Sequence, residues 1–202
     1  MTSPAAIMRL APVIPVLVIE DAALARPIAE ALVAGGLFAL EVTLRTPAAL
    51  DVIREMAKVK GAIVGAGTVL NTADLHASID TGAQFIVAPG LTQPLGEAAI
   101  ASGIPFLPGI ANAGDIMRGL DMGFTHFKFF PAEASGGIKA LSALIAPFRG
   151  VQFCPTGGVT QLSAPDWLAL DAVLCVGGSW IINKGAPDFT AITTAAKAAS
   201  LL

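Results

Sequence analysis

Charged side chains are scarce in this chain. Asp, Glu, Lys and Arg make up only 13% of its 202 residues, against about a quarter in an ordinary soluble domain, whereas 54% of the residues are hydrophobic. So few charged residues leave part of a folded surface apolar, and we expect self-association to cover that patch. The formal net charge is -3 and the basic residues are scattered, which argues against a nucleic-acid-binding stripe.

Long hydrophobic runs are also missing. No apolar run approaches the roughly 18 residues of a membrane span, because Pro and Gly interrupt the longest ones. Pro12 and Pro15 break the first apolar stretch, so neither a signal peptide nor a membrane segment is expected.

Cysteine and histidine are rare as well. Cys154 and Cys175 each lie in an apolar, strand-like run, where a reduced core thiol is the usual state. His76 and His126 have no nearby cluster of His, Asp or Glu that resembles a metal site. We therefore expect a cytoplasmic protein that holds no metal.

What the sequence does contain is one unit repeated eight times, an apolar strand followed by an amphipathic helix. The strands are expected at residues 13–19, 38–44, 62–68, 85–89, 105–109, 126–130, 152–156 and 172–176. The helices are expected at 21–35, 47–58, 72–81, 93–101, 112–122, 137–146, 163–170 and 188–201, after a short N-terminal helix at 4–10.

Strands that alternate with helices predict a parallel α/β sheet, and eight such units favour a (β/α)8 TIM barrel as a single domain over residues 1–202. Barrels of this class usually have about 250 residues, so the loops should be short. An open, doubly wound sheet is the alternative. It would carry a glycine fingerprint after the first strand, and Ile19-Glu20-Asp21-Ala22 has no glycine.

The stretch His126-Phe127-Lys128-Phe129-Phe130-Pro131 carries the strongest chemical signal. On a strand, Lys128 and Phe130 share one face with His126, while the other two phenylalanines take the opposite face. Burial among aromatic rings favours the uncharged amine, which is the form that attacks a carbonyl to make a Schiff base. The alternative is a surface lysine whose stem covers the aromatic side chains and whose ammonium group lies in water.

Polar residues also end the second expected strand, which reads Glu41-Val42-Thr43-Leu44-Arg45. By alternation Glu41 and Arg45 point into the barrel, where burial is costly unless a partner or a ligand is present. Glu41 could move protons there, and the planar guanidinium of Arg45 suits a carboxylate. A structural Glu41–Arg45 ion pair is the alternative.

Small residues and glycines end several other strands. Thr68 supplies a hydroxyl after a run of small residues, and Pro89 ends the fourth strand as a rigid wall. The pairs Gly157-Gly158 and Gly177-Gly178 follow the seventh and eighth expected strands, and the second pair is expected to open a helical turn. Loops at these two strands often bind phosphate in a barrel, because exposed backbone N–H groups at a helix start attract anions.

Five motifs together resemble the 2-keto-3-deoxy-6-phosphogluconate (KDPG) aldolase family. They are Glu41-Val42-Thr43-Leu44-Arg45-Thr46, Gly65-Ala66-Gly67-Thr68-Val69-Leu70, Phe127-Lys128-Phe129-Phe130-Pro131-Ala132-Glu133, Phe153-Cys154-Pro155-Thr156-Gly157-Gly158 and Cys175-Val176-Gly177-Gly178-Ser179-Trp180. They run in order from the second strand to the eighth and so cover nearly the whole chain.

The resemblance implies a class I aldolase of the Entner–Doudoroff pathway, built as a homotrimer of eight-stranded barrels. Such an enzyme splits the phosphorylated keto acid KDPG into pyruvate and glyceraldehyde 3-phosphate, and it often also acts on 4-hydroxy-2-oxoglutarate. No cofactor is implied, because the protonated imine draws the electrons during bond cleavage.

The resemblance also assigns roles to this chain's residues. Lys128 would form the Schiff base and Glu41 would be the general acid and base. Further roles would be carboxylate binding by Arg45 and Thr68, substrate contact by Pro89, Phe130 and Thr156, and phosphate binding by Gly157, Gly158, Gly178 and Ser179.

This chain departs from the family at the end of the first strand. Some relatives have a phosphate-contacting arginine there, whereas this chain reads Val18-Ile19-Glu20-Asp21, so backbone groups and Ser179 would do most of the binding. Three other functions stay open at this point. They are an aldolase for the galactose-configured substrate, a phosphosugar isomerase or epimerase that uses Glu41 without a covalent lysine, and a non-catalytic scaffold.

Overall fold

The computed structural model describes residues 3–182 and 185–202, and these contain nine short strands in two parallel sheets. The six-stranded sheet has the order β5-β4-β3-β2-β1-β9, and the three-stranded sheet has the order β6-β7-β8. The strands are β1 Val13–Leu17, β2 Ala39–Thr43, β3 Ile63–Gly67, β4 Phe85–Val87, β5 Phe106–Leu107, β6 Gly109–Ile110, β7 His126–Phe129, β8 Gln152–Pro155 and β9 Val176–Gly178.

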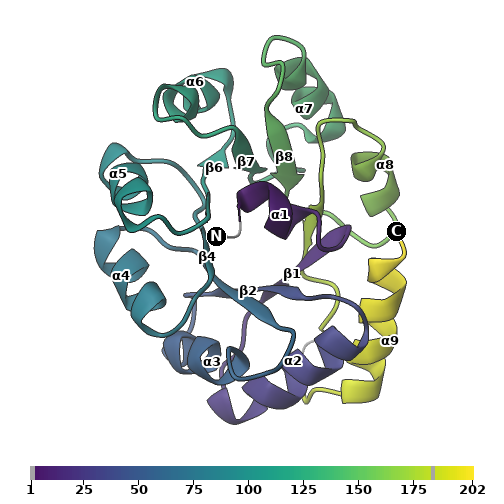
Figure 1. Cartoon of the computed structure of the whole chain (residues 1–202). Coiled ribbons are helices and arrows are strands. Elements are labelled where there is room, and N and C mark those ends of the chain that lie inside the picture. The colour runs from purple at the N-terminus through teal and green to yellow at the C-terminus, as the bar shows by residue number, and fades with distance from the viewer. Residues whose placement is uncertain (1–2, 183–184) are drawn as a thin grey trace.

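Helices alternate with these strands and, except for α1, lie around the outside of them (Figure 1). Parallel neighbours need such crossovers, so the predicted alternating α/β fold is confirmed. The helices are α1 Pro4–Met8, the 3₁₀ turn η1 Ala22–Leu24, α2 Ala25–Ala34, α3 Ala49–Met56, α4 Thr72–Asp80, α5 Gln93–Ser102, α6 Ala113–Asp121, α7 Gly137–Ile145, α8 Ala164–Leu168 and α9 Phe189–Ser200.

The fifth expected strand, 105–109, is a correction to the sequence prediction. It forms two pieces, β5 and β6, which belong to different sheets. Pro108 lies between them and has no N–H to donate to a ladder, although its carbonyl accepts a hydrogen bond from the Lys128 N–H at 2.9 Å. The two sheets therefore separate at the proline.

The eighth expected strand, 172–176, is also corrected. The strand begins at Val176 and includes Gly177 and Gly178, which were expected in a loop beyond it. Both glycines pair with β1, where Ile14 and Pro15 are their partners. A glycine pair signals a turn in the sequence, but here its small size fits a buried strand. Between β8 and β9 there are only isolated bridges, so a continuous eight-stranded ladder is not seen.

Two hydrophobic clusters surround the strands. The larger one fills the space between strands and helices and includes side chains that are fully buried, such as Phe127, Phe129 and Trp167. The smaller one joins strand side chains to α1 and includes Ile14, Phe85 and both cysteines. Alternation along strands such as β1 and β4 therefore supplies both clusters, one from each face.

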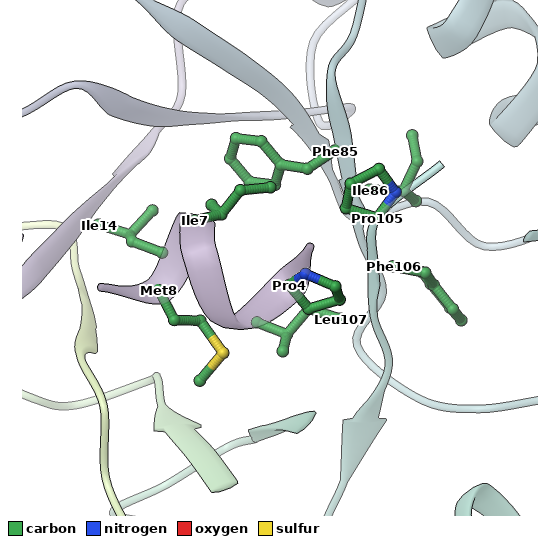
Figure 2. A pocket seen from close by; sticks show the side chains of 9 residues that line it. All are labelled: Pro4, Ile7, Met8, Ile14, Phe85, Ile86, Pro105, Phe106 and Leu107. Atoms are coloured by element: carbon green, nitrogen blue, oxygen red, sulfur yellow. The ribbon is translucent and has the colours of Figure 1, made fainter. Parts of the chain in front are cut away.

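Helix α1 crosses the middle of the ring of strands and fills it from one side (Figure 1). Ser3 caps this helix by accepting a hydrogen bond from the Ala6 N–H. Ile7 and Met8 point from α1 toward the strands, with Phe85 among their neighbours (Figure 2). The apolar cavity between them is only about 10 Å³, so α1 seals this side of the fold.

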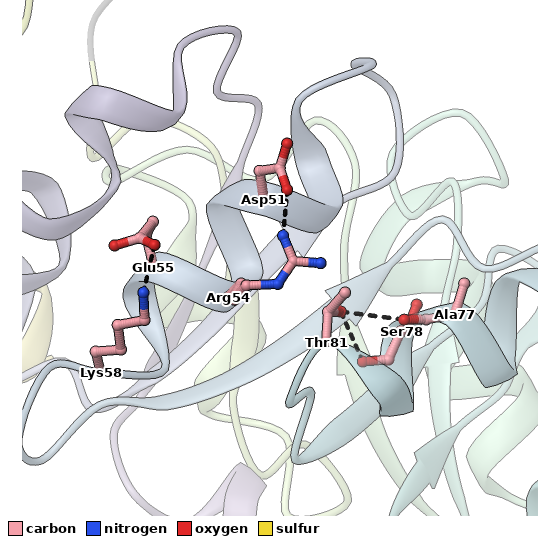
Figure 3. Close-up of polar contacts among 7 residues, drawn as sticks. All are labelled: Asp51, Arg54, Glu55, Lys58, Ala77, Ser78 and Thr81. Carbon is pink, nitrogen blue, oxygen red and sulfur yellow. Dashed lines mark hydrogen bonds and ion pairs between the residues drawn. The ribbon is translucent and has the colours of Figure 1, made fainter.

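The outer faces of the helices carry the few charges. On α3, Asp51 pairs with Arg54, and Glu55 pairs with Lys58 just beyond the end of the helix. The Thr81 hydroxyl bonds to carbonyl groups at the end of α4 (Figure 3). Exposed pairs of this kind contribute little to stability, so they mark the solvent side of the helices. Within the described residues, no helix combines the length and the hydrophobicity needed to cross a membrane.

We predict that α1 contributes to stability through Met8, which is 1% exposed. Met8→Ala should lower the free energy of unfolding by about 2–5 kcal/mol, because it leaves a cavity in the core. Leu162→Ala is the control, since Leu162 is 91% exposed, and it should change stability by about 0.5 kcal/mol or less. Urea unfolding measures both, and equal losses would show that α1 does not close the core.

Candidate active site

Lys128 is buried among the strands, and its ammonium group forms an ion pair there. It lies on β7 between Phe127 and Phe129, whose fully buried side chains take the opposite face of the strand. The side chain of Lys128 is 5% exposed, and its Nζ lies 3.0 Å from Oε1 of Glu41. The prediction of a buried lysine is confirmed, and the alternative of a solvated surface lysine is wrong.

Glu41 comes from β2, on the other sheet. Its neighbours Leu40 and Val42 are fully buried against the helix layer, so alternation turns the carboxylate inward, where it is 4% exposed. Each charge pays a desolvation penalty that only a close partner offsets, and each is the other's partner. Thr43, the next inward residue, donates to the carbonyl of Leu17 at 2.9 Å and is thereby held in the structure.

The aromatic ring of Phe130 lies beside this ion pair. Lys128 Nζ is 5.3 Å from the centre of the Phe130 ring, which is within the range of a cation–π contact. Phe130 is half-buried and directly follows β7, and its peptide bond to Pro131 is cis. The ring therefore covers the amine from the end of the strand.

Arg45 and Thr68 follow the neighbouring strands β2 and β3, and their side chains are in contact. Arg45 is exposed just beyond β2, and its Nε donates to Oγ1 of Thr68 at 3.3 Å. Thr68 follows β3 with a φ of 59°, and it alone among the described non-glycine residues has a positive φ. This backbone conformation is unfavourable for a threonine, and such strain concentrates at functional positions. The alternative of a Glu41–Arg45 ion pair is wrong, because Glu41 pairs with Lys128.

Thr156 directly follows β8, the strand that pairs with β7. It is 5% exposed, and its hydroxyl donates to the carbonyl of Cys154 at 3.4 Å. A side chain on Gly177 of the neighbouring segment would overlap it, since a Cβ there would lie 2.8 Å from Cγ2 of Thr156. Pro89 is half-buried two residues beyond β4.

The expected phosphate-binding residues come from two adjacent segments. Gly157 and Gly158 directly follow Thr156, both with positive φ, and a bridge joins Thr156 to Gly177. Gly178 therefore lies near them as the last residue of β9, and the exposed Ser179 comes next. The expected helical turn after Ser179 is wrong for the part described, because Trp180 and Ile181 form a simple turn. Residues 183 and 184 are outside the described residues.

Glu133 joins this glycine segment to the end of β7, a link that the sequence did not reveal. Its N–H donates to the carbonyl of Gly157 at 3.0 Å, and its Oε1 accepts from Nε1 of Trp167 on α8 at 3.1 Å. Gly158 leaves room for it, because a Cβ there would lie 2.7 Å from Cβ of Glu133. The only sign of this link in the sequence was that Glu133 ends the motif that contains Lys128.

The two cysteines are free and buried, as predicted for reduced core thiols. A hydrogen bond with Cys154 and the burial of the group raise the pKa of the Cys175 thiol well above its usual value. Cys154 pairs in register with Lys128, and its Sγ lies 3.8 Å from Oγ1 of Thr156. Because Cys175 stays a neutral thiol, it adds no charge next to the ion pair.

No group of three or more His, Cys, Asp or Glu side chains suited to a metal ion occurs within 3–182 and 185–202. The two reactive groups that the strands bring into contact are an amine and a carboxylate. Both are buried near the carboxyl ends of their strands, where the ends of β3, β4, β8 and β9 bring the other candidate residues.

We predict that removing one partner of the ion pair destabilises the protein more than removing both. Lys128→Met should lower the free energy of unfolding by about 3–5 kcal/mol, because it leaves the Glu41 carboxylate buried without a partner. The double variant Lys128→Met with Glu41→Met should be more stable than the single variant. Urea unfolding without added ligand tests this, and a double variant with the summed loss of both single variants would contradict it.

Comparison with known proteins agrees with this geometry. The family model for KDPG and KHG aldolase matches residues 5–195. The 2-dehydro-3-deoxy-phosphogluconate aldolase of Zymomonas mobilis is 59% identical over 194 residues, 96% of this chain and 93% of the relative. A crystal structure of the Zymomonas mobilis 2-keto-3-deoxy-6-phosphogluconate aldolase with 3-phosphoglycerate matches with a TM-score of 0.97 and 57% identity, covering 99% of this chain and 96% of that one.

A second solved structure carries information about the chemistry. The KDPG aldolase of Legionella pneumophila, in which pyruvate was captured at low pH as a covalent carbinolamine intermediate, matches with a TM-score of 0.96 and 44% identity over 98% of both chains. These matches span almost the full length of this protein and of its relatives. The chain therefore belongs to the KDPG and KHG aldolase family.

Proposed function

We propose that this protein is a class I aldolase that cleaves 2-keto-3-deoxy-6-phosphogluconate into pyruvate and glyceraldehyde 3-phosphate. The observation that carries the proposal is the buried contact of 3.0 Å between Lys128 Nζ and Glu41 Oε1. It puts a nucleophilic amine beside a group that can accept and return its proton. The family membership and the covalent pyruvate adduct of the Legionella pneumophila relative support the same chemistry.

The reaction begins with the loss of a proton from Lys128. Glu41 accepts it across the hydrogen bond, and the free amine attacks the C2 carbonyl to form a carbinolamine. The proton returns from Glu41 to the C2 hydroxyl, which leaves as water, and a cationic imine remains on Lys128. Positioned proton transfer of this kind typically contributes about 10² to 10⁴ in rate.

Bond cleavage uses the same two residues. The Glu41 carboxylate, directly or through a water, takes the proton of the C4 hydroxyl, and the C3–C4 electron pair moves toward the imine nitrogen. The products are the aldehyde and an enamine on Lys128. Glu41 then protonates C3 of the enamine, and hydrolysis releases pyruvate. The iminium is the electron sink, so the proposed reaction needs no cofactor.

The remaining residues bind the substrate in this proposal. Arg45 holds the C1 carboxylate together with Thr68, since they already share a hydrogen bond of 3.3 Å. Pro89, Phe130 and Thr156 contact the carbon chain.

Gly157, Gly158, Gly178 and Ser179 bind the phosphate. The bridge between Thr156 and Gly177 brings these two segments together, and the Zymomonas mobilis relative was crystallised with a phosphorylated acid. Glu20 and Asp21 follow the first strand, and Asp21 caps η1 through the Ala23 N–H, so the phosphate contacts are assigned to the glycine segments and Ser179.

The same site suits 4-hydroxy-2-oxoglutarate as a second substrate, because it also has a 2-keto acid and a hydroxyl at C4. We favour the gluconate-configured substrate over its galactose-configured isomer because the Zymomonas mobilis relative that is 59% identical carries that name.

Three further assignments complete the proposal. The strands close into an eight-stranded barrel within one domain, with β5 and β6 as a single bent strand and with the Phe153–Val173 and Thr156–Gly177 bridges joining β8 to β9. The protein forms a homotrimer, which covers exposed apolar side chains such as Ile100 and Met117. It works in the cytoplasm, a compartment in which free cysteines persist.

The decisive experiment traps the imine. Wild-type protein treated with pyruvate and borohydride should carry one reduced pyruvate on Lys128, as peptide mapping by mass spectrometry would show. Lys128→Met should form no adduct and release no pyruvate from KDPG. Lys139→Arg is the matched control, because Lys139 is exposed on α7, and it should behave as the wild type. Pyruvate release by Lys128→Met would refute the Schiff-base mechanism, and a wild-type protein that forms no adduct and releases no pyruvate would favour an isomerase or epimerase that uses Glu41 as a base.

A second prediction tests the carboxylate site. Arg45→Ala should raise KM for KDPG by about 10- to 100-fold, since a charged hydrogen bond contributes about 1.5–3 kcal/mol. Arg54→Ala removes an exposed arginine of α3 that pairs with Asp51, and it should leave KM unchanged. Steady-state assays of pyruvate release measure both constants, and an unchanged KM in Arg45→Ala would refute the role of Arg45.

A further inference from the structure

Gly67 ends β3 directly beside the ion pair. In the parallel register of β2 and β3, Gly67 is the partner of Thr43 and Gly65 is the partner of Glu41. Alternation directs Gly65 and Gly67 toward the same inner side as Glu41. Both glycines are buried.

The space that a side chain would need at Gly67 is taken by Glu41. A Cβ there would lie 2.6 Å from Cγ and 2.8 Å from Cδ of Glu41, and closer still to Oε1. Oε1 is the oxygen that accepts the hydrogen bond from Lys128 Nζ. Gly67 does not have a positive φ, so its backbone would tolerate alanine and the need for glycine is one of space.

We propose that Gly67 is a positioning residue, whose missing side chain fixes where the Glu41 carboxylate meets Lys128. The inference deepens the proposed function, because it rests on Glu41 as the group that transfers protons. A methyl group at 67 can be accommodated most cheaply by rotation of the Glu41 side chain, which moves the carboxylate and leaves the strands in place. A displacement of about 1 Å in a catalytic group can cost about 10²-fold in rate.

Gly65 provides a matched control on the same strand and the same face. A Cβ on Gly65 would overlap the ring of Phe85, which is an apolar core residue. Gly65→Ala and Gly67→Ala therefore add the same methyl group two residues apart. Gly65→Ala disturbs the apolar packing of Phe85, whereas Gly67→Ala disturbs the Glu41 carboxylate.

The experiment separates proton transfer from folding and binding. For each variant we would measure urea unfolding, kcat and KM for KDPG, and the exchange of the methyl protons of pyruvate in D₂O, which reports proton transfer at C3 of the Lys128 adduct. Gly67→Ala should lower kcat and the exchange rate by about 10²-fold with a much smaller change in KM. Gly65→Ala should lose stability and keep most of its exchange rate. A wild-type exchange rate in Gly67→Ala would overturn the inference.

Shortening Glu41 tests whether the two residues act through contact. Glu41→Asp withdraws the carboxylate by one methylene, which makes room for a methyl group at 67. In the wild-type background, Glu41→Asp should lower the proton-exchange rate. In the Gly67→Ala background, the same change should either raise the exchange rate again or lower it by a much smaller factor than in the wild type. Independent, additive losses would contradict the proposed contact.

The double variant also decides the case in which Gly67→Ala does not fold. A folded Glu41→Asp/Gly67→Ala protein would identify overlap with Glu41 as the cause, and an unfolded one would count against the inference. If wild-type protein forms no borohydride-stable adduct with pyruvate, the proposed function fails and the inference falls with it. If the adduct forms on Lys128 and Gly67→Ala exchanges protons normally, the positioning role alone fails.

Discussion

A buried contact between one ammonium and one carboxylate determines how the rest of this molecule is arranged. Lys128 and Glu41 are both almost inaccessible to water, and neither would tolerate burial alone. They come from β7 and β2, which belong to separate sheets, so their contact requires the two sheets to face each other. The fold thus holds two charges in an apolar interior, where a proton can pass from one to the other without competition from solvent.

Around this ion pair, several glycines leave space that neighbouring side chains occupy. Gly177 has no Cβ, and the side chain of Thr156 occupies that space. Gly178 likewise leaves room for the ring of Trp180. Glycine is costly in a strand because it packs little surface and loses more backbone entropy on folding. At these two positions the cost is offset because the side chains of Thr156 and Trp180 occupy the space that a Cβ would need.

The sequence predicted much of the fold and the position of the lysine, because both follow from the period of a strand. Alternation in Phe127-Lys128-Phe129 was enough to place Lys128 inside. The same rule put Glu41 inside but could not identify its partner, because the two residues are 87 positions apart and lie on strands that are not neighbours. Arg45 lies in a turn beyond β2, where alternation no longer applies, and there it bonds to Thr68.

Local signals also failed where tertiary packing overrode them. Pro108 was expected inside a strand, yet its missing N–H divides that strand between two sheets. Gly177 and Gly178 were expected to form a loop but pair with β1 as part of β9. The left-handed backbone of Thr68 had no sequence signal, since threonine rarely adopts it.

Each of the two tryptophans is linked to one of the glycine segments that are proposed to bind phosphate, Trp180 by direct contact and Trp167 through Glu133. The Trp167 indole donates to Glu133, whose N–H holds the carbonyl of Gly157, and the Trp180 ring fills the space beside Gly178. Indole emission responds to hydrogen bonding and to nearby charge. The protein therefore has one indole linked to each glycine segment, and the fluorescence of these two indoles would report changes at either segment.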